Sequence, residues 1–528
     1  MDKSKISASE YRSFTGLRDS VSNNIDNFAK SFEDALCVLT SDDLAPLVEL
    51  VAWCESPNLF FTRSNEGSVT FSRSIQASHF VFNIERVDGV NPLANQDPGN
   101  FSPLGAELEN IFPTRGTNSY PYAYEHIAQV FDHPCAPDVI AVHTAQHKYD
   151  TNLGNHGSLG VIQARAPFIA CGPGIRRQGF VDDHCRLVDV APTILKVLGV
   201  PTVGGIGPGG IFQDDGLYLT RQDGRPVDRI LEPGFNPQRV LVFLLDGCNA
   251  NVLYDRCESG ELPHISGLIN RGTAFRHGAI STLPTVTLAN HTSLMTGCFP
   301  AHHGVLHNAW WDRQLNRQVV TESITTWHTA MDWLTPATET IHQALKRSRP
   351  NSVTYSVNEP ADSGATWSTF EFFRQGKQMD VMPDLAGPFP LAHPEVADFS
   401  PHTRFGVVAD TMALNHGTGL WLGELYGQTM ELPDFCWINM PLIDSVFHDT
   451  GPHSELSRLA LLETDARIGE ILAMVERRGV LDDTAIFLVA DHGMEQSNPD
   501  ITESWNPYLE RAGVKFRDEA YGFLYINP

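Results

Sequence analysis

The sequence predicts an α/β fold in which a mostly parallel central sheet lies between layers of helices. After residue 238, apolar runs of strand length alternate with stretches of helical period, which is typical of a parallel sheet with helical connections. Three runs, at residues 239–245, 436–443 and 484–490, are almost continuously apolar, as expected of strands buried on both faces.

The other elements follow from local patterns. Residues 47–90 form four apolar or alternating runs between Asn, Gly and Ser breaks, which predicts a β meander and hence a small β-rich subdomain. Residues 455–478 are amphipathic and end before Gly479, as a helix would. Residues 201–237 are rich in Gly and Pro and are predicted to be a linker. Residues 360–432 are expected to form an irregular cap over the site.

Net charge limits the class of partner. The chain has 37 Lys and Arg against 63 Asp and Glu, a net charge of −26, which argues against a groove for long nucleic acid. A small phosphorylated substrate held by metal ions is compatible with this charge, because bound cations invert the local field. The sequence leaves the oligomeric state open.

Targeting patterns and cysteine usage favour a cytoplasmic protein with no membrane partner. The first residues lack the apolar core of a signal peptide, and no apolar run is long enough to span a bilayer. Nine cysteines, an odd number without regular C-x-x-C pairs, are typical of free thiols in a reducing compartment.

Chemistry-bearing residues gather where the predicted strands end. Asp246, Asp444 and Asp491 each follow one of the three apolar runs, and ligands of open α/β sheets bind beyond the carboxyl ends of the strands. His448 lies four residues after Asp444, so the two share a face if that segment is helical, and His492 follows Asp491 directly. Two adjacent cations need about six such protein ligands, and this part of the chain supplies five.

Three motifs resemble the alkaline phosphatase superfamily, and within it the type I phosphodiesterase/nucleotide pyrophosphatase family. They are Asp246-Gly247, the T-x-x-N-H motif that begins at Thr287, and the H-G-x-x-x-N motif that ends at Asn308. The resemblance implies an alkaline-phosphatase-like fold and a metal-dependent phosphoric-ester hydrolase.

The resemblance also implies a circular permutation. In the family, the remaining histidine ligand lies in a Gly-His-Gly-like loop after the Asp-His-Gly motif, but here no histidine follows His492. The loop that resembles it contains His156, near the other end of the chain. Residues 1–200 would then correspond to the family's C-terminal third and residues 238–528 to its first two-thirds, together forming one catalytic domain. The alternative is a degenerate first domain fused to a complete second one, but each part holds a separate share of a single ligand set.

By resemblance, one metal would be bound by Asp246, Thr287, Asp491 and His492. The other would be bound by Asp444, His448 and His156. The mixed carboxylate and imidazole set suits Zn²⁺ better than Mg²⁺, with Mn²⁺ as an alternative.

Thr287 is the predicted nucleophile, since metal coordination lowers the pKa of a hydroxyl, and the resemblance gives Asn308 the role of donating to a phosphate oxygen. Local sequence alone also allows a helix-capping threonine and a turn asparagine. Thr285 is interpreted as structural. Asn290 and His291 are expected to hold the loop, and the clustered histidines His302, His303 and His307 to have supporting or structural roles.

The predicted function is a phosphodiesterase or nucleotide pyrophosphatase that acts on a small phosphorylated substrate through a phospho-threonine intermediate. A phosphomonoesterase or phosphonate hydrolase on the same two-metal site is the nearest alternative, and a non-catalytic metal-stabilised binding protein is a remote one. Leu288-Ala289 replaces the Phe-Pro of many nucleotide-cleaving members of the family, which weighs against a nucleotide substrate.

Overall fold

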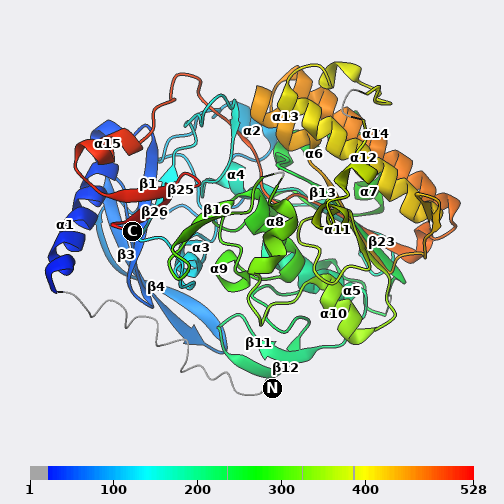
Figure 1. Ribbon diagram of the computed structural model, residues 1–528, viewed down its shortest axis with the longest axis horizontal. Helices are drawn as coiled ribbons and strands as arrows, with labels where there is room; N and C mark the ends of the chain where they lie inside the picture. Colours follow the sequence, from blue (N-terminus) through cyan, green and yellow to red (C-terminus); the bar gives the residue numbers. More distant parts are fainter. Residues whose placement is uncertain (1–21, 235, 324, 385–386) are drawn as a thin grey trace.

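The computed structural model describes residues 22–234, 236–323, 325–384 and 387–528. An eight-stranded sheet lies at its centre (Figure 1). In spatial order its strands are β19 (Trp367–Ser368), β18 (Thr354–Val357), β22 (Phe435–Met440), β13 (Arg239–Leu245), β23 (Thr484–Val489), β8 (Phe168–Cys171), β14 (Gly272–Phe275) and β9 (Gly179–Val181). All neighbouring strands are parallel except that β8 is antiparallel to both β23 and β14, so the predicted mostly parallel sheet is confirmed.

The three predicted apolar strands lie side by side in this sheet. β13 pairs with β22 and β23, and every residue of β22 and β23 is buried. Leu245 pairs with Met440, and Leu244 pairs with Val489. The three strands therefore end at the same edge, where the segments that carry the predicted acids begin.

Helices cover both faces of the sheet (Figure 1). One layer includes α7 (Pro263–Arg271), α12 (Pro401–Leu422) and α14 (Glu455–Arg477), and the other includes α5 (Val190–Val197), α8 (Thr287–Thr296) and α10 (Ile341–Ser348). The predicted helix over residues 455–478 is α14, and the side chain of Ser454 caps its first turn by accepting from the Ser457 backbone N–H.

The expectation that residues 360–432 are irregular was wrong for α12. This helix of 22 residues packs against α13 (Leu442–Thr450) and α14. Because α12 is buried on several sides, its apolar and small residues do not keep to a single stripe, and the helical period is hidden in the sequence.

A second sheet of seven antiparallel strands confirms the predicted β-rich subdomain. Its order is β25 (Phe516–Glu519), β26 (Phe523–Ile526), β5 (Val139–His143), β1 (Val48–Ser56), β2 (Leu59–Arg63), β3 (Gly67–Gln76) and β4 (His79–Gly89). Helix α1 (Ser22–Leu39) packs on one face, and residues beside α8, such as Leu283 and Trp310, pack on the other. Both ends of the described chain thus contribute to one sheet.

The predicted linker at residues 201–237 contains a hairpin, β11 (Val203–Ile206) and β12 (Phe212–Leu217). The turn after it is packed inside the protein, and Asp223 is only 3% exposed. Within the described residues, no helix combines the length and apolar character needed to cross a membrane.

Candidate metal centre and nucleophile

The predicted acids lie at the carboxyl edge of the central sheet. Asp246 follows β13 directly, and Asp491 lies two residues beyond β23. Asp444 lies in the first turn of α13, with His448 one turn later on the same face, as the four-residue spacing predicted. The Nε2 atom of His448 is 3.4 Å from the Oδ1 atom of Asp444.

His156 reaches this edge from the first third of the chain. It follows the short strand β6 (Gly154–Asn155), which pairs with β24 (Glu495–Gln496) just beyond His492. The ring of His156 stacks on that of His492 with centroids 3.8 Å apart, and its Nε2 atom is 3.1 Å from the Nε2 atom of His448. The structure therefore brings together predicted ligands that are almost 300 residues apart.

Three groups of side chains at this edge could each hold a metal ion, because their ligand atoms lie within 4.8 Å of one another. The groups are His156, Asp444 and His448; Asp246, Asp444 and His492; and Asp246, His291 and Asp491. They share members, so they form one continuous cluster.

Three of the four imidazoles of this cluster, those of His156, His448 and His492, share one hydrogen-bonding pattern. The Nδ1 atom of each contacts a backbone carbonyl oxygen: His156 that of Thr285 at 2.8 Å, His448 that of Gly154 at 2.9 Å, and His492 that of Gly493 at 3.0 Å. An Nδ1–H that donates to a carbonyl leaves the Nε2 lone pair free to bind a metal. With the proton on Nδ1 in both His156 and His448, their Nε2 lone pairs would face each other at 3.1 Å, an arrangement that a shared cation would stabilise.

Several buried polar atoms of the cluster have no hydrogen-bond partner among the described residues. They are the Oδ1 atoms of Asp246 and Asp444, the Oδ2 atom of Asp491, and the Nε2 atoms of His291 and His492. Leaving such atoms unpaired destabilises a fold unless something else binds them. Carboxylates and imidazoles form a donor set that fits divalent cations such as Zn²⁺.

Burial and mutual repulsion shift the pKa values of these groups. Burial, and then the charge of Asp246, raise the pKa of Asp491 to about 6 and that of Asp444 well above its ordinary value. Burial lowers the pKa of His448 to about 4, and burial with the neighbouring His492 and His448 lowers that of His156. His156 and His448 are therefore neutral at pH 7, which is the form that binds metals.

Gly247 permits the close approach of two strand ends. Its φ is +63°, and a Cβ atom there would lie 2.3 Å from the Oδ1 atom of Asp444. Its backbone N–H donates to the Oδ1 atom of Asp491 at 3.0 Å. A glycine after Asp246 thus lets all three carboxylates share one site.

His291 is more central than the sequence suggested. Its Nε2 atom is 3.5 Å from Asp246 and 3.6 Å from Asp491, while Glu359 contacts its Nδ1 atom at 2.9 Å. Burial opposes protonation, but the charge of Glu359 and the contact with Asp246 outweigh it, so the pKa of His291 is raised well above its ordinary value. The available sequence signal was the position of His291 four residues after Thr287, which places both on one face of a helix.

The side chain of Asn290, by contrast, bonds to the loop residues 282–286, as expected of a residue that holds the loop.

Thr287 is half-buried and is the first residue of α8. It lies one helical turn before His291, so its side chain is on the side of the helix that faces Asp246. Thr285 has a different environment: its hydroxyl donates to the Ser158 carbonyl at 2.8 Å and accepts from the Gly157 N–H at 2.9 Å. Thr285 therefore joins the His156 loop to the start of α8, and its hydroxyl is occupied.

Asn308 lies beside the start of α8. Its Oδ1 atom accepts from the Leu288 backbone N–H at 3.3 Å, and its Nδ2 atom donates to the carboxylate of Glu322. Glu322 is a residue of this site that the sequence did not indicate, since it lies in a loop without periodic pattern.

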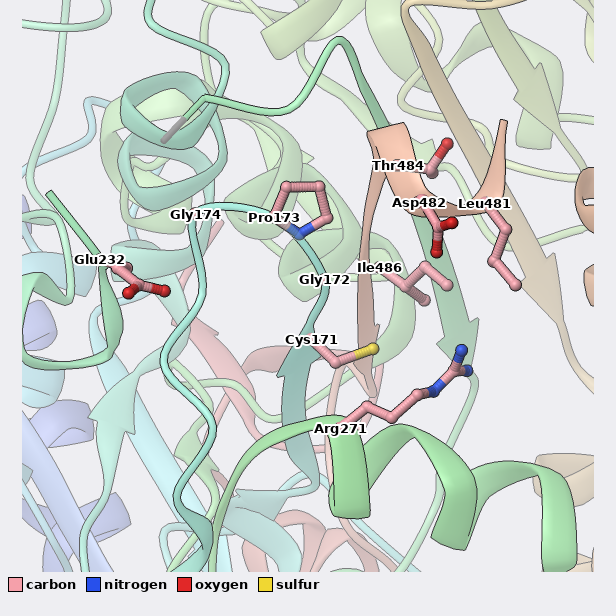
Figure 2. A pocket seen from close by; sticks show the side chains of 10 residues that line it. All are labelled: Cys171, Gly172, Pro173, Gly174, Glu232, Arg271, Leu481, Asp482, Thr484 and Ile486. Carbon is pink, nitrogen blue, oxygen red and sulfur yellow. The ribbon is translucent and has the colours of Figure 1, made fainter. Parts of the chain in front are cut away.

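Another pocket lies at the opposite edge of the central sheet (Figure 2). Cys171 and Thr484 line it, and Thr484 begins the strand that leads to Asp491 at the other end. The pocket in Figure 2 is therefore separated from the metal-ligand cluster by the length of β23.

Comparison with known protein families gives a match over residues 240–528 to the type I phosphodiesterase / nucleotide pyrophosphatase family, more than half of the chain. The chain belongs to this family. The family and superfamily that the three motifs indicated are thereby confirmed, and the match begins after the segment predicted to be permuted.

Individual relatives are distant. Ectonucleotide pyrophosphatase/phosphodiesterase family member 3 of Mus musculus is 25% identical over 284 residues, which cover 53% of this chain and 27% of that protein. Venom phosphodiesterase of Macrovipera lebetinus is 24% identical over 296 residues, covering 56% of this chain and 29% of that protein. A solved structure of murine ectonucleotide pyrophosphatase / phosphodiesterase 5 aligns with a TM-score of 0.35 at 18% identity, covering 53% of this chain and 63% of that chain. The chain thus spans about a quarter of the length of the first of these curated relatives.

Proposed function

We propose that this protein is a metal-dependent phosphodiesterase or nucleotide pyrophosphatase that acts on a small phosphorylated substrate through a phospho-threonine intermediate. One observation carries the proposal. Carboxylate and imidazole atoms without partners converge at His291, one helical turn after a threonine at a helix N-terminus, in a chain of this family.

Two divalent cations, Zn²⁺ in preference to Mn²⁺, fit the donor set. Asp246, Thr287, Asp491 and His492 would hold one, with His291 beside it, and Asp444, His448 and His156 would hold the other. When bound, the cations would lower the pKa of the nucleophile and neutralise charge on the phosphate oxygens.

The chain's own residues supply the nucleophile and its orientation. The Oγ1 atom of Thr287 gives up its proton and attacks phosphorus, the bond from phosphorus to the leaving oxygen breaks, and the released alkoxide takes up a proton to become the alcohol. Water then cleaves the new bond between Oγ1 and phosphorus and restores the hydroxyl. The N-terminus of α8 favours the negative charge of the phosphate, because its first N–H groups and the helix dipole point toward the substrate.

Asn308 is placed to donate to a non-bridging phosphate oxygen. The Leu288 N–H and Glu322 fix both ends of its amide, so one Nδ2–H remains for the substrate. A fixed donor aimed at developing charge contributes to catalysis, typically by about 10²–10³-fold in rate when such a donor is removed.

The proposal includes the circular permutation. Three pairings support it: β23 with β8, β24 with β6, and β26 with β5 each join the last 50 residues to the first 200. His156, the ligand that the second part lacks, lies next to one of these pairings. A single active site assembled from both parts is what a permuted chain requires.

Hydrolysis of bis-p-nitrophenyl phosphate and of p-nitrophenyl phosphate tests the function. Metal-stripped protein, resupplied with Zn²⁺ or Mn²⁺, should cleave the diester faster, and Thr287→Ala should abolish this turnover while retaining bound metal. Thr292→Val, a change in the same helix away from the proposed chemistry, is the control. A preference for the monoester would reassign the protein as a phosphatase, and two bound metals without turnover of either ester would favour a binding role.

Restoring the family's order of segments tests the permutation. A chain opened between β11 and β12, with residue 528 joined by a flexible linker to the start of α1, should fold with the same metal content and activity. A chain divided at residue 237 and expressed as two separate pieces should bind two metals only when the pieces recombine. Two bound metals in the second piece alone would favour a fusion of two domains.

A further inference from the structure

Glu322 places a carboxylate beside Asn308 of the proposed active site. The residue is exposed, yet it acts on the metal-ligand cluster, since its charge contributes, after burial and the charges of Asp246 and Asp491, to the raised pKa of Asp444. Among the described residues, no lysine or arginine forms an ion pair with Glu322. Desolvation by the surrounding protein raises the pKa of Glu322 to about 7, so its carboxylate is fully charged at alkaline pH, beside Asn308.

The contact between Glu322 and Asn308 fixes where this charge lies. The Nδ2 atom of Asn308 donates to the carboxylate, while the Oδ1 atom of Asn308 accepts from the first turn of α8, the helix that begins with Thr287. The amide of Asn308 therefore links Glu322 to the helix turn that carries the proposed nucleophile, Thr287. A phosphoryl group bound to the second Nδ2–H of Asn308 would have Glu322 as its next neighbour.

We propose that Glu322 makes the site selective for monoanionic phosphodiesters and disfavours dianionic phosphomonoesters. The inference rests on the proposed function and specifies its substrate class. A diester carries one negative charge shared by two non-bridging oxygens, and its remaining oxygens are esterified. A monoester at alkaline pH adds a second charge.

Like charges repel strongly even near a protein surface. At an effective dielectric constant near 20, two like unit charges about 4 Å apart repel strongly enough to change relative binding by more than tenfold. Two cations would attract a dianion more strongly than a monoanion, so a group that favours the monoanion must be a negative charge outside the metal ligands. Glu322 is such a residue, whereas a lysine at the same position would favour the dianion.

Three variants separate the charge of Glu322 from its hydrogen bond. Glu322→Gln removes the charge but keeps an acceptor for Asn308, and Glu322→Ala removes both. Glu476→Gln, at an exposed position in the last turn of α14, is matched in chemistry and net charge. For each, kcat/KM is measured for bis-p-nitrophenyl phosphate and p-nitrophenyl phosphate with Zn²⁺ present, at an alkaline pH at which Glu322 is ionised.

We expect Glu322→Gln to shift the ratio of kcat/KM values toward the monoester by about tenfold or more. Glu322→Ala should give the same shift and also lower kcat for both esters, because Asn308 loses its orientation. Glu476→Gln should leave the ratio unchanged. An unchanged ratio in Glu322→Gln would overturn the inference while leaving the proposed function intact.

A binding measurement makes the inference testable even without turnover. Calorimetric titration of the zinc-loaded protein with inorganic phosphate and with dimethyl phosphate compares a dianion with a monoanion. Glu322→Gln should bind inorganic phosphate about tenfold more tightly than the wild type does and dimethyl phosphate about equally. If the wild type and the variant bound both anions with equal affinity, the inference would be overturned. If Glu322→Gln bound inorganic phosphate more tightly but the wild type hydrolysed neither ester, only the proposed function would be overturned.

Discussion

Two buried clusters of histidine and aspartate lie beside helix α8. They differ in whether their polar atoms have hydrogen-bond partners. In the first, at the carboxyl edge of the central sheet, several carboxylate and imidazole atoms have no hydrogen-bond partner. In the second, His302 lies between Asp223 at 2.7 Å and Asp132 at 3.0 Å, and Arg73 contacts Asp132 at 2.6 Å. The second cluster is complete as it stands.

The presence or absence of hydrogen-bond partners distinguishes a candidate metal site from a structural ion-pair network. Residue type does not, because both clusters contain residues that bind metals. In the second cluster, opposite charges alternate, so burial is offset by pairing. In the first, carboxylates neighbour carboxylates and lone pairs face each other, so the cluster is stable only with positive charge added. Unpaired atoms, not residue composition, distinguish the two.

The largest expected effect of breaking the first cluster is loss of a metal. His156→Ala and His448→Ala should each remove one metal equivalent, measured by elemental analysis, and lower diester hydrolysis by about 100-fold or more. His302→Gln should keep both metals. If His156→Ala retained both metals, His156 would not be a ligand, and the argument from facing lone pairs would fail.

Breaking the second cluster should instead affect stability. His302→Gln should lower the free energy of unfolding by about 3 kcal/mol, because it leaves the Asp223 carboxylate buried without its cation. Burial opposes protonation of His302, but Asp223 and Asp132 outweigh it and raise the pKa of His302. The stabilisation is therefore complete below the ordinary histidine pKa, about 6.5, and is lost as pH rises through the folded-state pKa.

Urea unfolding of the wild type and His302→Gln across that pH range would measure this difference. It should be largest at the acidic end and shrink toward alkaline pH. A difference that is constant with pH would show that His302 contributes packing only. Catalytic activity at saturating Zn²⁺ should change little, in contrast with His156→Ala.

Adding metal should stabilise the first cluster and leave the second unaffected. Zn²⁺ at about 100 times its dissociation constant should raise the free energy of unfolding of metal-stripped protein by about 2.7 kcal/mol for each site. His302→Gln should gain the same increment, and His448→Ala should gain less. Thermal unfolding with and without Zn²⁺ measures the increment, and no gain in the wild type would contradict metal binding to the native state.

The sequence predicted the features that depend on neighbouring residues in the chain. The apolar runs that became β13, β22 and β23 fixed both the sheet and the edge at which Asp246, Asp444 and Asp491 meet. His156 was identified only by its resemblance to a family loop, because nothing near it in the sequence indicates that β6 pairs with β24.

Residues whose position depends on packing between distant segments were not predicted. Glu322 lies in a loop with no periodic pattern, and its bond to Asn308 is a tertiary contact. The roles of His302 and Asp223 depend on how the segment after β12 folds back, and that segment was expected to be only a linker. Helix α12 was hidden because burial on several sides removes the polar face that marks a helix.

The smallest expected effect is that of changing Thr285, which joins the His156 loop to the start of α8. Thr285→Val should lower the free energy of unfolding by about 1.5 kcal/mol, because a nearly isosteric side chain leaves the Gly157 N–H and the Ser158 carbonyl buried and unpaired. The matched control is Thr292→Val, whose hydroxyl donates to the Leu288 carbonyl within α8 and leaves no group of another segment unpaired. Zinc affinity should fall in Thr285→Val and not in Thr292→Val, since the lost bonds hold the loop that carries His156. Equal zinc affinities in the two variants would show that the carbonyl of Thr285, which accepts from His156, suffices to position that ligand without the hydroxyl.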